Sequence, residues 1–124
     1  APGNAGTFSD LNSNIQANSN IILDKDYKYD SSADSSLSSG IIINKDTTID
    51  GASHIISGSN SKDVRLFAVN KGTLTLKNII ITDLNYNADD KGIIYQKTTR
   101  IRLMTNTTIY RDHYWDNNKP YCEV

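Results

Sequence analysis

The sequence has little that could crosslink it, anchor it in a bilayer or attract a polyanion. Its 124 residues contain one cysteine, Cys122, which excludes an internal disulfide, a thiolate zinc site and a CxxC redox motif. No apolar run approaches the roughly 18–20 residues needed to span a bilayer, so we expect no membrane insertion. With 13 basic and 14 acidic side chains the formal charge is −1, which gives no reason to expect nucleic acid as a partner.

The residues that are abundant favour strands and turns. The chain has 16 isoleucines against 8 leucines, with 11 threonines and 7 tyrosines, a mixture typical of strands. Its 14 asparagines and 13 serines favour the turns that join short strands. A chain of this length fits one domain. We therefore expect a single all-β domain over residues 1–124.

An internal repeat organises the chain. Segments 40–49, 66–75 and 92–101 begin alike and align without gaps. Five columns recur at a spacing of 26 residues: Lys45, Lys71 and Lys97; Asn44, Asn70 and Gln96; Thr47, Thr73 and Thr99; Ile41, Phe67 and Ile93; and Ile43, Val69 and Tyr95. A fixed period of this length indicates a solenoid in which each repeat stacks on its neighbour.

Each copy of the repeat divides into three short strands separated by polar turns. Three strands and three turns in about 26 residues match one coil of a right-handed parallel β-helix. We therefore predict an all-β solenoid of three to four coils. The expected coils are a short one at 20–40 and full ones at 41–66, 67–92 and 93–118.

Two further columns refine the predicted coil. Ile49, Leu76 and Leu103 are spaced by 27 residues, which one extra residue in the first turn of the later coils would explain. The column that contains Asn44 predicts an amide ladder, in which stacked side chains hydrogen-bond one another. Alternation along the strand that begins at Ile41 places Ile41 inside and Ile42 outside.

The N-terminal segment has the pattern of a short helix. Thr7 with an acid three residues later resembles a capping box. Phe8, Leu11 and Ile15 then fall on one face of a helix over residues 8–17. We expect this face to close the amino-terminal end of the solenoid, whose open strand edges would otherwise invite end-to-end self-association.

The C-terminal segment 110–124 has a different character because it concentrates aromatic residues. They include Tyr110, Tyr114, Trp115 and Tyr121. The segment can fold over the last coil as an aromatic lid, be the cut edge of a longer protein, or present a ligand platform on which sugars stack. The sequence leaves these three alternatives open.

Two groups of charged side chains are candidates for ligand binding. The column of Lys45, Lys71 and Lys97 would set three ammonium groups on one face, where an anionic glycan or carboxylate ligand could bind; the simpler interpretation is a solvated row. A weaker set could bind calcium, which prefers six to eight oxygen ligands. Two pairs spaced by 26 residues make up this set: Asp63 with Asp89, and Asp90 with Asp116.

No catalytic signature emerges from the repeat. His54 and Asp50 were the first candidates to consider, but one period later they align with Ile80 and Leu76, so neither has an aligned polar partner. We therefore expect His54 to be a turn residue, and we predict neither a catalytic residue nor a cofactor.

Four stretches of the chain carry a family resemblance. They are Gly6–Leu11, Ile21–Tyr27, Ile43–Gly51 leading to His54, and Leu74–Ile79. Across residues 6–85 the chain resembles the amino-terminal unit of adhesin-like parallel β-helix proteins of archaeal and bacterial cell surfaces. The shared stretches are turn and core elements, so their specificity is for architecture.

The resemblance implies a secreted, extracellular or cell-surface protein without enzymatic activity, which presents loops for attachment to a glycan or to a host or microbial surface ligand. Right-handed β-helices also include polysaccharide lyases and hydrolases, so a carbohydrate-active or glycan-binding module is an alternative. A purely structural stalk is a second alternative.

Overall fold

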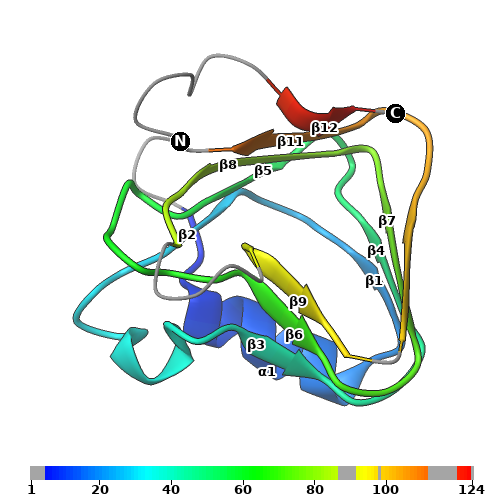
Figure 1. Ribbon diagram of the computed structural model, residues 1–124, viewed down its shortest axis with the longest axis horizontal. Coiled ribbons are helices and arrows are strands. Elements are labelled where there is room, and N and C mark those ends of the chain that lie inside the picture. Colours follow the sequence, from blue (N-terminus) through cyan, green and yellow to red (C-terminus); the bar gives the residue numbers. More distant parts are fainter. Residues whose placement is uncertain (1–4, 87–91, 98, 112–119, 124) are drawn as a thin grey trace.

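The chain winds into a parallel β-solenoid of about three turns, with one short helix at its amino-terminal end. The computed structural model describes residues 5–86, 92–97, 99–111 and 120–123, with side chains up to residue 110. Viewed along the winding axis, three sheets form the sides of a triangle around one interior (Figure 1). The predicted fold class is therefore confirmed.

Each full coil contributes one strand to each of three sheets, here named A, B and C. Sheet C consists of β3 (Ile41–Ile43), β6 (Phe67–Val69) and β9 (Ile94–Gln96). Sheet B consists of β1 (Asn20–Ile22), β4 (Thr47–Asp50), β7 (Thr73–Lys77) and β10 (Arg100–Leu103). Sheet A consists of β2 (Tyr27–Lys28), β5 (Ile55–Ser57), β8 (Ile79–Leu84), β11 (Thr107–Arg111) and β12 (Pro120–Glu123). Neighbours pair in parallel, except that β12 is antiparallel to β11.

The apolar columns align in the structure largely as the repeat predicts. Ile49 pairs with Leu76, and Leu76 pairs with Leu103, so this predicted column is confirmed. Ile41 pairs with Phe67 and is completely buried, whereas Ile42 points outward with 47% exposure. Strand alternation therefore sets which side chains fill the interior.

The third copy of the repeat is displaced by one residue in sheet C. Phe67 pairs with Ile94, not with Ile93, and Val69 pairs with Gln96, not with Tyr95. The reason is that the carbonyl of Ile93 accepts hydrogen bonds from the amides of both Leu66 and Phe67, so Ile93 lies at the corner before the strand. The predicted spacing is therefore wrong by one residue at this point.

The predicted threonine column is also wrong, because Thr47 pairs with Leu74 and Thr73 pairs with Arg100. The extra residue lies in the turn before β7, at Gly72, whose φ is +83°. A Cβ on Gly72 would lie 2.6 Å from the carbonyl carbon of Lys45. Glycine therefore lets the longer turn pass against the coil below without a steric clash.

Helix α1 (Phe8–Ala17) occupies the sheet C side of the first coil (Figure 1). Its predicted capping box is present: Thr7 accepts from the Asp10 amide, and Asp10 accepts from the Thr7 amide. Phe8, Leu11 and Ile15 are buried against the interior. The helix therefore closes this end of the solenoid, as predicted.

The serine-rich loop after β2 is held to the start of α1 by one buried carboxylate. This loop contains the short 3₁₀ helix η1 (Ser35–Leu37), and Asp34 just before it is completely buried. Asp34 accepts from the amides of Phe8 (2.9 Å) and Ser9 (2.8 Å), which are unpaired donors at the helix start. It also accepts from the Ser9 hydroxyl (2.6 Å) and the Asp30 amide (2.8 Å).

The end of the chain continues sheet A. Where the repeat pattern weakens, β11 still forms, because the hydroxyl of the buried Thr107 donates to the carbonyl of Leu76 at 3.2 Å. Strand β12, which the sequence did not predict, turns back along β11. Of the predicted aromatic platform, Tyr114 and Trp115 lie outside the described residues. Within the described part, no helix is long and apolar enough to cross a membrane.

Candidate functional site

The three lysines of the candidate site lie at the corner between sheets C and B. Lys45 and Lys71 follow the paired residues Ile43 and Val69 by two positions each, so they occupy equivalent places in successive coils. Lys97 follows Gln96, the partner of Val69, by only one position. The row is therefore aligned for two lysines and displaced by one residue at the third.

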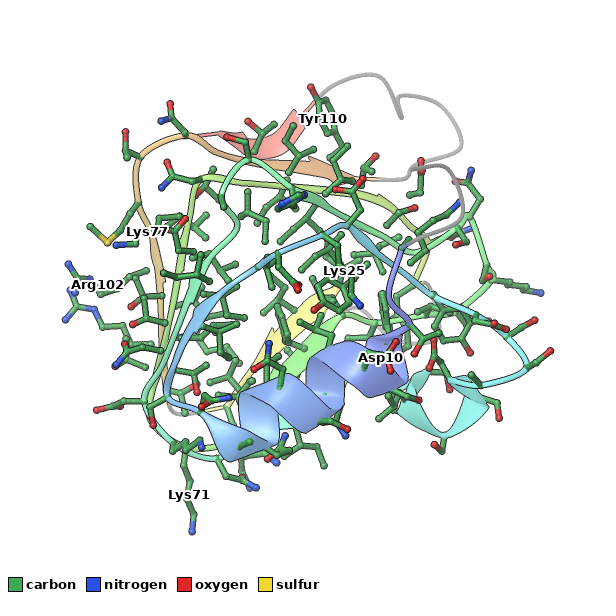
Figure 2. All side chains as sticks on the ribbon, turned by 180° about the vertical axis from the view of Figure 1, so that it is seen from behind. Asp10, Lys25, Lys71, Lys77, Arg102 and Tyr110 are labelled. Carbon is green, nitrogen blue, oxygen red and sulfur yellow. The ribbon has the colours of Figure 1, made fainter. Side chains whose placement is uncertain are left out.

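The environments of these ammonium groups differ. Lys71 and Lys97 are exposed, and Figure 2 shows the Lys71 side chain pointing away from the solenoid. Lys45 is half-buried, and its Nζ donates to the carbonyl of Gln16 at the end of α1, at 3.1 Å. Two of the three cations are thus available to a ligand, while the third also connects the helix to the coil.

The predicted amide ladder is wrong, because Gln96 pairs with Val69 and its side chain donates to the carbonyl of Thr99. Asn44 and Asn70 are exposed. Within the described residues, no hydrogen bond joins the side chains of these two asparagines.

A ladder forms instead at the corner between sheets B and A. Asn106 donates through Nδ2 to Asn78 Oδ1 at 3.3 Å, and Asn78 donates through Nδ2 to Asp50 Oδ1 at 3.2 Å. Both asparagines have φ near the left-handed region, at +58° and +53°. The Ala52 amide, then the Asn78 side chain, and the charge of Lys77 hold the pKa of Asp50 below its ordinary value. Each step in this ladder spans 28 residues, a spacing that a search at 26 misses.

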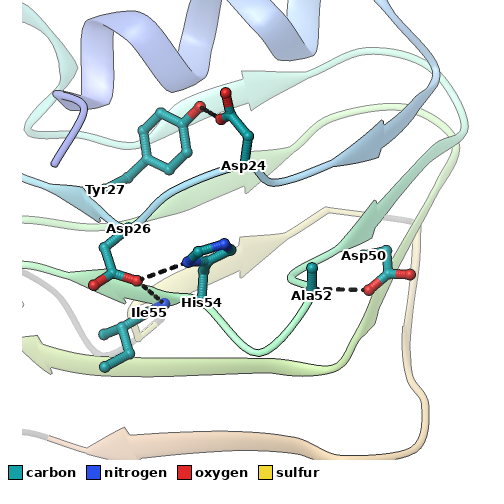
Figure 3. A network of polar contacts seen from close by, with 7 residues as sticks. All are labelled: Asp24, Asp26, Tyr27, Asp50, Ala52, His54 and Ile55. Carbon is teal, nitrogen blue, oxygen red and sulfur yellow. Dashed lines mark hydrogen bonds and ion pairs between the residues drawn. The ribbon is translucent and has the colours of Figure 1, made fainter. Parts of the chain in front are cut away.

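His54 has a carboxylate partner, so the expectation that it lacks one is wrong. Its Nδ1 lies 3.2 Å from Asp26 Oδ1, which also accepts from the amide of Ile55 at 2.9 Å (Figure 3). Asp26 belongs to the coil below, 28 residues earlier in the chain. The repeat map compared His54 only with the following coil and therefore missed this contact. Both side chains are accessible, at 34% and 49% exposure.

The calcium candidates are only partly described. Asp63 is half-buried, has a φ of +56°, and its amide donates to the carbonyl of Asn85 at 2.6 Å. Asp89, Asp90 and Asp116 lie outside the described residues. Among the residues that the structure does describe, no three His, Cys, Asp or Glu side chains lie close enough to hold a metal ion.

Two open grooves lie beside α1 and its loop. One, of about 420 Å³, is lined by hydroxyl and charged side chains that include Thr7, Lys28, Asp30 and Ser61. The other, of about 340 Å³, lies between α1 and β3 and is lined by the amides of Asn12, Gln16 and Asn44 with Leu37 and Ile42. The lysine corner, the His54–Asp26 pair and these grooves are separate features and do not form one catalytic constellation.

Comparison with known proteins adds no relative. No family model, no curated protein and no solved structure matches the chain.

Proposed function

We propose that the chain is a non-enzymatic, adhesin-like module of an extracellular or cell-surface protein, which uses the solenoid as a rigid support for attachment to an anionic surface glycan. The observation that carries this proposal is how the carboxylates at the described corners are used. Asp34, Asp46 and Asp50 accept hydrogen bonds from the chain's own amides. These acids stabilise turns, and they do not converge on a shared pocket as a general acid and base would.

The lysine corner is the proposed contact with the ligand. Lys71 and Lys97 are exposed cations on successive coils, and adjacent parallel strands lie about 4.8 Å apart. A polymer with repeated carboxylate or sulfate groups can therefore meet more than one cation at once. Because the contacts are solvent-exposed, binding should weaken as salt is raised.

A glycan array with cells in parallel tests this proposal. The test variant is Lys45/Lys71/Lys97→Ala, and the matched control is Lys28/Lys62/Lys77→Ala, which removes the same charge elsewhere. The proposal predicts that the test variant loses binding to acidic glycans while the control retains it. Equal binding by both variants would contradict the lysine corner as the contact, and no binding by the wild type would favour a purely structural stalk.

A carbohydrate-active enzyme is the second candidate, and one observation favours it. A carboxylate that orients an accessible histidine, as Asp26 does with His54, is an arrangement used for proton abstraction. Incubation with acidic polysaccharides, followed by assays for unsaturated products and new reducing ends, tests this candidate. Activity that His54→Ala abolishes would support it and displace the non-enzymatic proposal.

A further inference from the structure

Sheet B is the one sheet whose edges are open at both ends within the described part of the chain. Sheet A is closed below β2 by Gly6, whose amide donates to Asp26 and whose carbonyl accepts from Lys28, and it is closed above by β12. Sheet C begins against α1. Sheet B instead ends at β1 on one side and at β10 on the other. Exposed strand edges of this kind are templates for pairing with another chain.

The free backbone groups of β1 can be identified from its bonds to β4. The amide of Leu23 donates to Asp50 at 2.9 Å, and the carbonyl of Ser19 accepts from Thr48 at 2.8 Å. Alternate residues of a strand direct their polar groups to opposite neighbours. Asn20 and Ile22 therefore direct their amides and carbonyls to the open edge.

The same reasoning applies to β10. The amide of Met104, which follows the strand, donates to Leu76 of β7 at 2.8 Å. By alternation, Ile101 and Leu103 direct their backbone groups to the open edge. Their side chains are only partly buried, so the interior is incompletely covered here.

The two edges are complementary when the columns of sheet B continue in register. The column Ile21, Ile49, Leu76 and Leu103 would then place Leu103 beside Ile21 of a second copy. Leu103 would donate to the carbonyl of Asn20 in that copy and accept from its Ile22 amide. The exposed Ile22 side chain (73%) would meet the exposed Met104 side chain (38%).

Charge favours the same orientation. Around β1, the exposed carboxylates of Asp10, Asp24, Asp26 and Asp30 outnumber the ammonium groups of Lys25 and Lys28. In the last coil, the charged side chains that the structure describes are all cationic: Lys97, Arg100 and Arg102. Figure 2 shows Arg102 on the outer side of sheet B. An acidic first coil and a basic last coil attract head to tail and repel in the two like-to-like arrangements.

We propose that a second copy of this chain pairs head to tail along sheet B, β10 of one copy with β1 of the next. Because β12 and the Gly6 segment occupy the sheet A ends, the contact is confined to sheet B and successive copies meet at an angle. Such a heterologous contact does not close on itself and so generates open chains of copies. The contact is small, so association is weak and concentration-dependent.

Sedimentation velocity over a wide concentration range tests the proposal, with two variants that each block one edge. Ile22→Pro removes the amide at the open edge of β1 and costs no bond within the chain, since edge strands tolerate proline. Arg102→Glu/Met104→Glu alters only outward side chains beside β10. Ile42→Asn is the control, because Ile42 is a comparably exposed isoleucine on sheet C. Circular dichroism verifies that each variant is folded.

The wild type and Ile42→Asn should grow beyond dimers as concentration rises, and each blocked variant alone should bind itself at least tenfold more weakly. An equimolar mixture of the two blocked variants retains one intact edge pair and should form dimers that grow no further. A monomeric wild type at every concentration, a wild type that stops at dimers, or a mixture that stays monomeric would each overturn the proposal.

Discussion

Replacing Asp34 with alanine removes the acceptor that joins the serine-rich loop to the start of α1. Three backbone amides and one hydroxyl donate to this carboxylate at 2.6–2.9 Å. Each buried donor left without a partner costs about 1–3 kcal/mol, and a hydrogen bond to a charged group is worth about 1.5–3 kcal/mol. Because water can reach the half-buried donors of Ser9 and Asp30, we expect a total loss of about 3–5 kcal/mol.

Equilibrium urea denaturation of three proteins measures this loss. Asp34→Asn keeps one acceptor oxygen, so it should lose about half as much stability as Asp34→Ala. Asp30→Asn, which changes an exposed carboxylate of the same loop, is the control and should stay within about 0.5–1 kcal/mol of the wild type. A loss below about 1 kcal/mol in Asp34→Ala would refute the assignment of Asp34 as the anchor of α1.

Acid should release the same contact. Burial acts to raise the pKa of Asp34, but hydrogen bonds from the Ser9 hydroxyl and from the Asp30, Phe8 and Ser9 amides outweigh it, so the pKa lies below the ordinary 3.8. The stabilisation is therefore fully present above that value and is lost as pH falls through the lower, folded-state value. Wild type and Asp34→Asn should differ less in stability as pH is lowered through this window; a constant difference would contradict the sign.

Three further substitutions test the turns and corners by urea denaturation. Gly72→Ala should cost about 2–4 kcal/mol, because φ is +83° and the new Cβ would lie 2.6 Å from backbone atoms of the coil below; a neutral effect would refute the close approach. Arg65→Lys should cost about 1–3 kcal/mol, because the buried guanidinium lies 4.1 Å from the Tyr86 ring and 5.3 Å from the Tyr95 ring while Nε donates to Gly92; equal stability would show that only the charge matters. Asn78→Ala should cost about 1–3 kcal/mol, since it breaks the ladder and places alanine at a positive φ, and Asn78→Gly should recover the backbone part; identical losses in both variants would assign the whole effect to the side chain.

The sequence predicts the strands of this fold better than its corners, and the reason is geometric. Inward apolar side chains must stack from coil to coil, so Ile49, Leu76 and Leu103 remain visible as a column. The turns between them vary in length. Residues that pair between the second and third coils are 26 apart from Ile41, 27 from Ile49 and 25 from Ile55. A single period of 26 therefore loses the corner ladder, the Asp26–His54 contact and the register of Lys97.

Side chains that act across the solenoid could not be predicted from the repeat at all. Asp34 interrupts a run of serines without a counterpart in the other coils, and its role depends on where α1 begins. Arg65 likewise has no repeated partner, and its contacts come from loops after β8 and around β9. Strand β12 pairs antiparallel and breaks the pattern of the coils. The capping box of α1 was predictable because its residues are close in sequence.

The central claim is that successive coils stack in the described register, and methyl NOE spectroscopy tests it most directly. With isoleucine, leucine and valine methyl groups labelled, Leu76 should show cross-peaks to both Ile49 and Leu103, its neighbours in the coils below and above. Cross-peaks from Leu76 to neither residue would contradict the stacked solenoid.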